Sequence, residues 1–154
     1  MDLKDIMSSD AVRNLPQASS KKRLLQTISE QAAAVYNLDA SEVLGALSER
    51  ENLGSTGVGH GVAIPHARFE SLDRVYGLFT RLDKPVDFDS IDRQPVDLVF
   101  TILAPQNEGA EHLKALALVS RTLRAENICT KLRANNDETT LFTLLTQQDD
   151  IRAA

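Results

Sequence analysis

The sequence predicts one α/β domain over residues 1–154, built around a mixed β-sheet. Three observations lead to this fold class. Apolar residues at helical spacing come first along the chain, strand-like segments fill its middle, and helical spacing returns in its last third. The connections between strands differ in length, and few of them form a regular β-α-β unit. We therefore expect both parallel and antiparallel pairs in the sheet.

The N-terminal third of the chain predicts a lead-in and two helices. The segment SSDAVRNLPQASS (8–20) is polar and contains a proline, so we expect it to be irregular. Ser20 is the expected N-cap of a helix over 21–37, and Asp39 is the expected N-cap of a second helix over about 40–50. The apolar positions that predict these helices are Leu24, Leu25, Ile28, Ala32 and Val35 in the first, and Val43, Leu44 and Leu47 in the second.

Three segments in the middle of the chain predict strands. GVAIP (61–65) is expected to be a short buried strand that ends at its proline. RVYGLFTRL (74–82) and DLVFTILA (97–104) are rich in β-branched and aromatic residues. The last of these is almost continuously apolar, which is typical of a central strand covered on both faces. The acidic stretch over 83–95 is bracketed by prolines and predicts a loop, with a short strand at 86–88 as an option.

From Gly109 onward the apolar pattern again has helical spacing. The first stretch predicts a long helix, and shorter helices are expected near 127–135 and 138–147. Helices before and after the strands complete the α/β sandwich. The stripe of the long helix that we expect to face the core consists of Leu113, Leu116, Ala117, Val119 and Ser120.

Composition and charge exclude several classes of protein. The hydrophobic content of 42%, the charged content of 25% and the net charge of −5 are those of an ordinary globular protein. The densest basic cluster, Lys21-Lys22-Arg23, is short and begins a helix, so we expect no nucleic-acid partner. No apolar run is long enough to span a membrane, and the N-terminus lacks the basic and apolar regions of a signal peptide. We therefore expect no membrane insertion and a cytoplasmic location.

The single cysteine, Cys129, excludes an intramolecular disulfide. It lies in the stretch NICTKLRAN, whose apolar residues have helical spacing. We expect it to be a small buried hydrophobic residue and not a nucleophile.

Residues 54–66, GSTGVGHGVAIPH, place four glycines before one histidine. Glycines let backbone N–H groups approach a bound group, and phosphate is a frequent one. The segment is not a P-loop, because His60 stands where that motif needs lysine. It is not a Rossmann fingerprint either, because a valine replaces the last glycine and the preceding element is helical. We expect Gly57, Gly59 and Gly61 to bring the backbone close to a phosphoryl group.

His66, which ends this segment, is the candidate nucleophile. Pro65 stiffens the backbone directly before it, and a neutral imidazole is a competent nucleophile near neutral pH. Arg50 upstream and Arg68 downstream could stabilise the charge of a transferring phosphoryl group. His112, at the start of a helix, could reach one of its oxygens. A packed structural role for His66 and a first-turn role without chemistry for His112 stay open as alternatives.

Three histidines are also enough to bind zinc. His60, His66 and His112 are scattered over a loop and a helix start, and none of them forms an H-E-x-x-H or H-x-H pair. We therefore expect neither a metal ion nor another cofactor.

Two parts of the sequence resemble one known family. RENLGSTGVGHGVAIPHAR (50–68) resembles the active-site segment of the IIA components of the bacterial phosphotransferase system, in the mannitol/fructose class. FDSIDRQPVDLVFTILAP (88–105), followed by EHLKALALVSRTL (111–123), resembles the second half of the same domain. The resemblance covers about 19–147, which is the expected core of the domain. The most similar subgroup is the nitrogen-regulatory IIA proteins, which stand alone without a fused transporter.

The resemblance implies a mixed sheet with helices on both faces. It also implies that His66 is phosphorylated on a ring nitrogen, and that Arg50 and His112 lie beside the phosphoryl group. The implied donor is an HPr-type phosphocarrier protein, which an enzyme I-type protein charges from phosphoenolpyruvate. The chain would be a phosphohistidine carrier, a component of a phosphotransferase chain and not a self-contained enzyme. Asparagine often occupies the position of His60 in this family, so histidine there is either a neutral replacement or a third titrating ring near the site.

We expect a regulatory phosphoryl carrier whose phosphorylation state modulates target proteins. The resemblance implies sensor kinases and transporters of potassium metabolism as targets. Two alternatives stay open: a sugar-specific IIA component that passes the group to a IIB partner, and a regulatory module that acts by docking alone. In a carrier His66 should lie in an accessible depression, and the candidate rim residues are Val58, Val62 and Leu113.

Overall fold

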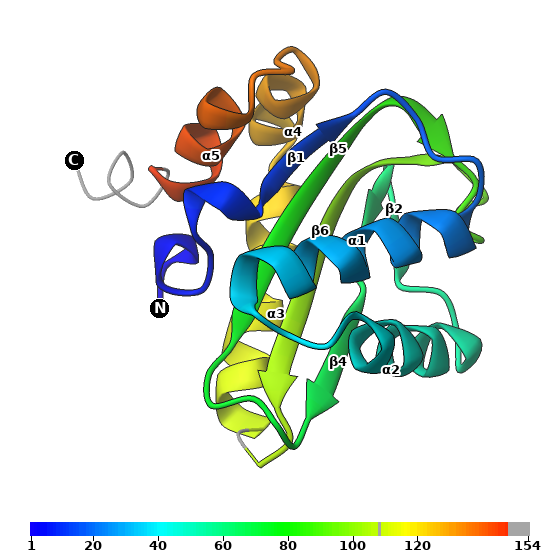
Figure 1. The fold of residues 1–154 in the computed structure, drawn as a ribbon. Coiled ribbons are helices and arrows are strands. Elements are labelled where there is room, and N and C mark those ends of the chain that lie inside the picture. Colours follow the sequence, from blue (N-terminus) through cyan, green and yellow to red (C-terminus); the bar gives the residue numbers. More distant parts are fainter. Residues whose placement is uncertain (108, 148–154) are drawn as a thin grey trace.

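A six-stranded mixed sheet forms the centre of the computed structural model, which describes residues 1–107 and 109–147 (Figure 1). The strands run in the order β1-β5-β6-β3-β2, and β4 also pairs with β6. The β5–β6 pair is antiparallel, whereas β1 pairs with β5, and both β3 and β4 pair with β6, in parallel. The strands are β1 (Val12–Leu15), β2 (Gly57–Gly59), β3 (Val62–Ala63), β4 (His66–Phe69), β5 (Tyr76–Val86) and β6 (Val96–Pro105).

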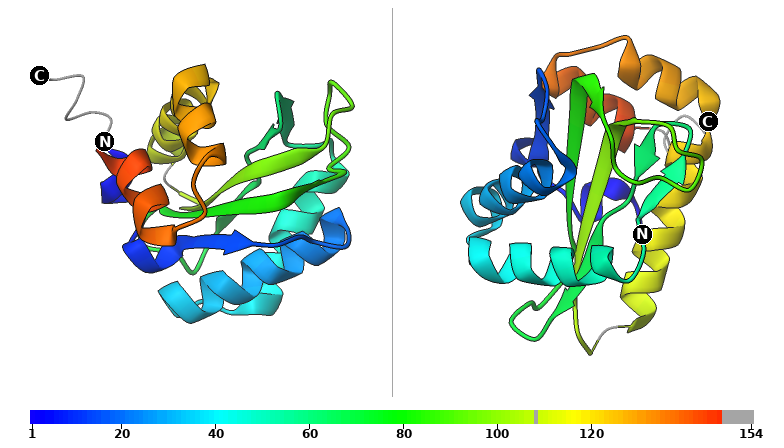
Figure 2. Two further views of the ribbon diagram at one scale, coloured as in Figure 1. Left: turned by 90° about the horizontal axis from the view of Figure 1, so that it is seen from above. Right: turned by 90° about the vertical axis from the view of Figure 1, so that its right-hand side faces the viewer.

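Helices cover both faces of this sheet, as the resemblance implies (Figure 2). On one face α1 packs against β5 and α2 against β4. On the other face α3 packs against β6 and contacts α4, while α5 lies beside β1. The helices are α1 (Lys21–Tyr36), α2 (Ala40–Asn52), α3 (Gly109–Arg124), α4 (Glu126–Arg133) and α5 (Glu138–Thr146), and two short 3-10 helices, η1 (Leu3–Asp5) and η2 (Ser9–Ala11), precede β1.

The caps of α1 and α2 confirm the two predicted N-caps. The Ser20 hydroxyl accepts a hydrogen bond from the Arg23 N–H at 3.0 Å. The Asp39 carboxylate accepts from the N–H groups of Ser41 and Glu42 at 2.9 and 3.2 Å. Each cap therefore satisfies N–H groups that a helix start leaves unpaired, and fixes where the helix begins. α1 ends at Asn37, whose φ of 56° is left-handed.

β6 is the central strand that its apolar sequence predicts. It lies between β5 on one side and β3 and β4 on the other, and its residues are buried except for the half-buried Asp97. β5 is longer than predicted, because it continues to Val86, which pairs with Val96. Phe88 is fully buried but lies in the following loop, so the optional strand at 86–88 does not form as a separate element.

Three sequence-based expectations were wrong. The lead-in over 8–20 is not irregular throughout, because it contains η2 and β1. The predicted strand over 61–65 forms only as the two-residue β3, and the chain resumes as β4 directly after Pro65. The stripe of α3 that faces the core is also different: its buried residues are His112, Ala115, Leu118, Val119, Thr122 and Leu123, while Leu113 is 63% exposed and Ala117 is exposed.

The first and third errors have the same cause, because a search for apolar residues misses structured positions that are polar. A polar edge strand needs few apolar residues, and in β1 only Val12 is fully buried. In α3 two polar residues, His112 and Thr122, occupy buried positions that a count of apolar residues passes over. The second error has a local cause, since a proline can lie between two strands that pair with the same neighbour.

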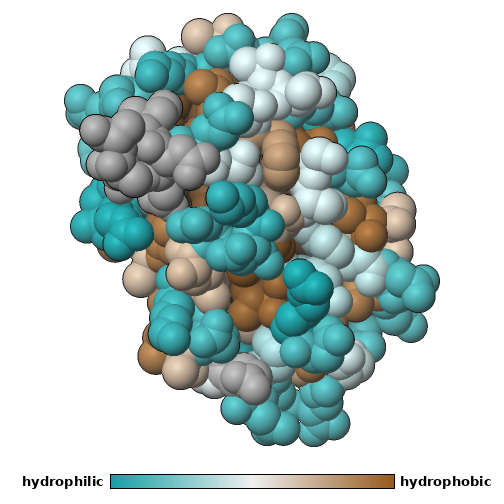
Figure 3. All heavy atoms as spheres, turned by 90° about the vertical axis from the view of Figure 1, so that its left-hand side faces the viewer, coloured by the Kyte–Doolittle hydropathy of each residue, from teal (hydrophilic) through white to brown (hydrophobic). Residues whose placement is uncertain are grey.

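Hydrophilic side chains cover most of the face shown in Figure 3, with smaller hydrophobic areas between them. Among the helices of the described residues, none combines the length and the apolar character that crossing a bilayer requires.

Candidate functional site

His66 is the first residue of β4 and lies at the edge of the sheet beside β6. Its ring is half-buried, and its Nδ1 atom lies 2.8 Å from the carbonyl oxygen of Ile64. A carbonyl oxygen only accepts hydrogen bonds, so Nδ1 must carry the proton in the neutral ring. Nε2 therefore keeps its lone pair. Nε2, and not Nδ1, is therefore the ring nitrogen that is available to act as a nucleophile.

The pleat of β4 directs His66 toward α3. Residues 66 and 68 share one face of the strand, whereas Ala67 and Phe69 point to the other face and are buried. Arg68 extends from the first face, and its Nε atom donates a hydrogen bond to Nδ1 of His112 at 2.9 Å. Strand periodicity thus places His66 and Arg68 together beside the first turn of α3.

His112 completes a pair of imidazoles. Its ring centroid is 5.4 Å from that of His66, and the two ring planes are inclined by 59°. Because its Nδ1 accepts from Arg68, its proton must be on Nε2 when the ring is neutral. His112 is 6% exposed, and within the described part of the chain its Nε2 atom has no hydrogen-bond partner. A buried N–H of this kind is available to donate to an oxygen that comes within its reach.

Both imidazoles are held neutral. Burial lowers the pKa of His66, the charges of Arg50 and Arg68 lower it further, and the Ile64 carbonyl and Glu51 act in the opposite direction. The pKa of His112 falls to about 4, chiefly through burial and then through the charges of His66 and Arg68. At neutral pH the site therefore combines a free lone pair on one ring with an N–H on the other.

Arg50 is held in place by the loop that follows α2. It lies in the last turn of α2, and its Nη1 atom donates to the carbonyl oxygen of Gly54 at 2.9 Å. Its charge acts on the pKa of His66, as does that of Arg68. Two guanidinium groups from different elements thus act electrostatically on one imidazole, which suits a group that carries several negative charges.

The chemistry of this pair of rings fits a known family. The profile of the family described as phosphoenolpyruvate-dependent sugar phosphotransferase system, EIIA 2, matches residues 5–148. The chain belongs to this family.

Several relatives of this EIIA 2 chain are named nitrogen regulatory proteins. The nitrogen regulatory protein of Bradyrhizobium diazoefficiens is 45% identical over 145 residues, which are 94% of this chain and 95% of the relative. That of Escherichia coli is 39% identical over 150 residues, which are 97% and 92% of the two chains. The crystal structure of IIA-Ntr from Neisseria meningitidis superposes with a TM-score of 0.85 at 34% identity, covering 92% of this chain and 97% of the other.

The glycines of the EIIA 2 chain build the hairpin of β2 and β3. Gly57 packs so tightly that a side chain there would collide with Ser90. Gly59 and Gly61 have φ values of 100° and 78°, a region that favours glycine. Their nearest side chains are Asp92 for the first, and Arg133 and Asp97 for the second. The backbone conformation of the turn is therefore enough to explain why residues 59 and 61 are glycines. Contact of Gly57, Gly59 and Gly61 with a phosphoryl group stays a prediction.

His60 lies at this turn and not beside His66. Its φ is 57°, its N–H donates to Asp92 at 2.9 Å, and its carbonyl oxygen accepts from Arg133 at 2.7 Å. Asparagine tolerates this left-handed conformation better than most residues, and histidine is also enriched there. The backbone thus gives a reason for either residue at position 60. Within residues 1–107 and 109–147 no group of three or more His, Cys, Asp or Glu side chains is arranged to hold a metal ion.

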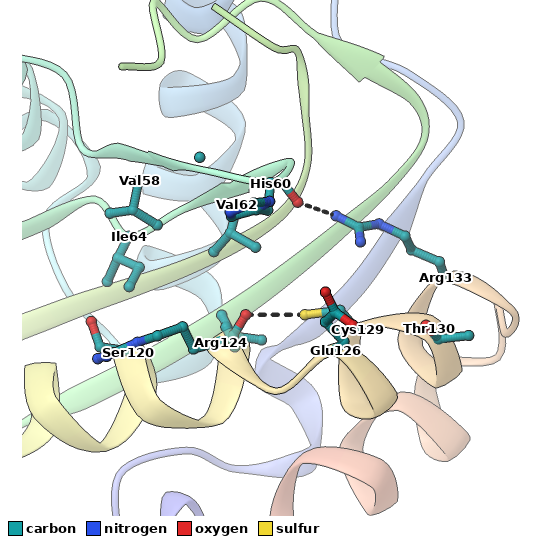
Figure 4. A pocket seen from close by; sticks show the side chains of 12 residues that line it. Val58, His60, Val62, Ile64, Ser120, Arg124, Glu126, Cys129, Thr130 and Arg133 are labelled. Atoms are coloured by element: carbon teal, nitrogen blue, oxygen red, sulfur yellow. Dashed lines mark hydrogen bonds between the residues drawn. The ribbon is translucent and has the colours of Figure 1, made fainter. Parts of the chain in front are cut away.

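A groove of about 640 Å³ lies between the β2–β3 segment and helices α3 and α4, and Ile64 is among the residues that line it. Figure 4 shows Val62 and Ile64 pointing from this segment toward Ser120 and Arg124 of α3. Cys129 also lines the groove, is buried, and donates from its sulfur to the Leu123 carbonyl, as expected of a packed residue. Burial also raises the pKa of its thiol.

Two parts of the site escaped the sequence analysis. The acceptor for the Nδ1 proton is a main-chain carbonyl, that of Ile64, and a main-chain group leaves no residue-type signal. Glu51 gives no signal in the sequence, because a glutamate in a helix with an acidic and basic surface is normally solvated. Its neighbour Arg50 was predicted, and the buried position of Glu51 became visible only in the fold.

Replacing Gly61 with alanine should destabilise the hairpin. A Cβ at this position would lie 2.5 Å from Nη2 of Arg133 and 2.9 Å from Oδ1 of Asp97, and the φ of 78° is strained for alanine. We expect the free energy of unfolding to fall by about 1–3 kcal/mol. In the matched control, Gly45→Ala in the middle of α2, nothing lies within 4 Å of the new Cβ, and stability should rise by about 0.5–1 kcal/mol. Urea unfolding of both variants measures the difference, and equal stability changes would contradict the role of the turn.

The stability of the protein should depend on His112 in acid. The ordinary histidine pKa is 6.5 and that of folded His112 is about 4, so between these values the unfolded chain binds a proton here that the folded chain does not. The free energy of unfolding therefore falls as the pH drops through this window. His112→Gln should show a shallower decline than wild type. Urea unfolding over this pH range measures both slopes, and identical slopes would rule out a depressed pKa.

Proposed function

We propose that this protein is a regulatory phosphoryl carrier, in which His66 accepts a phosphoryl group from an HPr-type phosphocarrier. The observation that carries the proposal is the complementary pair of rings, with a free lone pair on Nε2 of His66 and an N–H on Nε2 of His112. The family description names phosphoenolpyruvate, which supports the same donor chain. This origin of the group is also our reason for proposing a cytoplasmic location.

In the proposed transfer, Nε2 of His66 attacks the phosphorus in line with the leaving nitrogen of the donor. The new bond is Nε2–P, and the bond that breaks is the P–N bond of the donor phosphohistidine. Such a transition state is loose and needs positioning and charge stabilisation more than covalent help. Nε2–H of His112 donates to a phosphoryl oxygen, while Arg50 and Arg68 stabilise the negative charge. Nδ1 of His66 keeps its proton on the Ile64 carbonyl throughout.

The donor would dock over a surface that includes exposed apolar residues. Leu113, which follows His112, is 63% exposed, and Val58, which lines the groove, is 53% exposed. Both fit the rim that the sequence analysis proposed, whereas Val62 is 2% exposed and belongs to the core. A protein covering these side chains would exclude water from the phosphoryl group, which otherwise hydrolyses.

Phosphorylation adds about −1.5 to −2 charge at one surface. This change is large enough to favour or oppose a target protein, and we propose that it regulates one. The nitrogen-regulatory relatives support regulation, and sensor kinases or potassium transporters are the expected targets. A pull-down comparing wild type, His66→Ala and His66→Asp tests this regulation, because aspartate places a negative charge at position 66 and alanine does not. Identical capture of a target protein by the three proteins would contradict regulation through His66.

The direct test incubates the protein with phosphoenolpyruvate, enzyme I and an HPr-type phosphocarrier, and then measures its intact mass. An increase of one phosphoryl group is expected. No increase would overturn the proposal in favour of a docking-only module. Loss of the phosphoryl group on adding a IIB protein with its sugar would instead favour a sugar-specific IIA component.

A further inference from the structure

Glu51 is a buried carboxylate that the transfer mechanism does not use. It lies in the last turn of α2, next to Arg50, and its side chain is 4% exposed. A buried carboxylate is unfavourable unless its oxygens are paired. Here Lys21 Nζ lies 3.0 Å from Oε1, the Thr56 N–H donates to Oε1 at 3.0 Å, and the Thr56 hydroxyl donates to Oε2. The carboxylate thus holds both the main chain and the side chain of Thr56.

Further main-chain bonds connect Thr56 to the nucleophile. The carbonyl oxygen of Thr56 accepts from the N–H of Ile64 at 3.0 Å. The carbonyl oxygen of Ile64 in turn lies 2.8 Å from Nδ1 of His66. An unbroken series of hydrogen bonds, which we call the Glu51 relay, therefore connects Glu51, Thr56, Ile64 and His66. It begins at a carboxylate and ends at the ring nitrogen that does not react.

The same residue also sets the turn that holds Arg50. The Gly54 N–H donates to the carbonyl oxygen of Glu51 at 3.1 Å, and the Gly54 carbonyl accepts from Arg50 at 2.9 Å. The bond between Glu51 and Thr56 closes this short segment from its other end. The imidazole is thus connected to the carboxylate of Glu51, and the Arg50 guanidinium to its main-chain carbonyl.

We propose that Glu51 is a positioning residue for phosphoryl transfer, which holds the Ile64 carbonyl in place as the acceptor for Nδ1–H and so fixes the His66 tautomer that leaves Nε2 free. This inference rests on the proposed function. When the relay is broken, the Ile64 carbonyl shifts, and the ring populates the other tautomer or another rotamer, neither of which presents a lone pair to the donor. The negative charge of Glu51 also partly offsets the effect of Arg50 and Arg68 on the pKa of His66.

The test compares Glu51→Ala and Glu51→Gln with Glu138→Ala as the matched control. Glu138 also accepts a main-chain N–H, that of Asn14 at 2.9 Å, but it does so at the start of α5. Nitrogen NMR of the unphosphorylated proteins, at a pH where His66 is neutral, measures its tautomer. The rate of phosphorylation by a fixed concentration of the HPr-type phosphocarrier is the second readout.

We expect wild type and the control to show the Nδ1–H form. Glu51→Ala should shift the ring toward the Nε2–H form and slow phosphorylation roughly 10- to 100-fold, with Glu51→Gln between the two. If the folded Glu51→Ala protein keeps the wild-type tautomer, the inference is overturned, even if its rate or stability falls. Should that variant not fold, the milder Glu51→Gln decides by the same readout. Absence of phosphorylation in wild type would defeat the proposed function alone, because the tautomer comparison needs no phosphoryl group.

Discussion

Substituting His66 with alanine is expected to abolish phosphoryl acceptance and leave the fold intact. In the proposed mechanism Nε2 of this ring is the only nucleophile. His112 cannot replace it, because its Nδ1 accepts from Arg68 and its Nε2 therefore carries the proton. His66 lies half-buried at the sheet edge, so its removal should cost little of the stability that the core supplies.

Intact mass after incubation with the complete donor chain measures this prediction. His60→Ala is the matched control, because it also removes an imidazole from the same segment but lies at the hairpin turn. The control should gain one phosphoryl group, and His66→Ala should gain none. A phosphorylated His66→Ala protein would mean that another residue is the acceptor.

Substituting His112 with alanine should give the second largest effect. The variant loses the Nε2–H donor and also the acceptor that holds Arg68 in place at 2.9 Å. Removing a single preorganised donor of a developing charge typically slows a reaction roughly 10²- to 10³-fold. We expect a decrease of this size in the rate of phosphorylation, together with some loss of stability because the ring is buried in the first turn of α3.

The rate within a preformed complex distinguishes this role from docking. If His112 acts on the transferring group, a single-turnover measurement at saturating phosphocarrier should show the decrease, and the concentration needed for saturation should change little. Leu113→Ala is the useful comparison, because this neighbour is 63% exposed and should affect saturation instead. Wild-type turnover in the His112 variant would place this residue outside the reaction.

Local patterns predicted the parts of the molecule that local physics decides. Short segments of sequence were enough to predict the caps at Ser20 and Asp39 and the central strand β6. A cap or a buried strand is specified by residues that are adjacent in the sequence. The glycine-rich segment predicted His66, with Arg50, Arg68 and His112 as candidate partners, and the family resemblance implied the same roles for Arg50 and His112. The structure brings the two rings within 5.4 Å of each other.

The remaining features depend on contacts between distant segments. β1 forms because residues 12–15 pair with residues 79–82 of β5, and the local sequence of neither segment reveals this pairing. The Ile64 carbonyl is a main-chain group, so no choice of residue reveals it. Glu51 is buried by Lys21 and Thr56, from α1 and from the segment before β2, and in its own helix it is indistinguishable from a surface glutamate.

The hydrogen bond between Nδ1 of His66 and the Ile64 carbonyl has a consequence for the proposed reaction. In the proposed transfer the proton on Nδ1 stays in place before and after the phosphoryl group arrives, so the ring needs no separate acid or base to reset it between transfers. Such a ring would hand the group on in the same protonation state in which it received it.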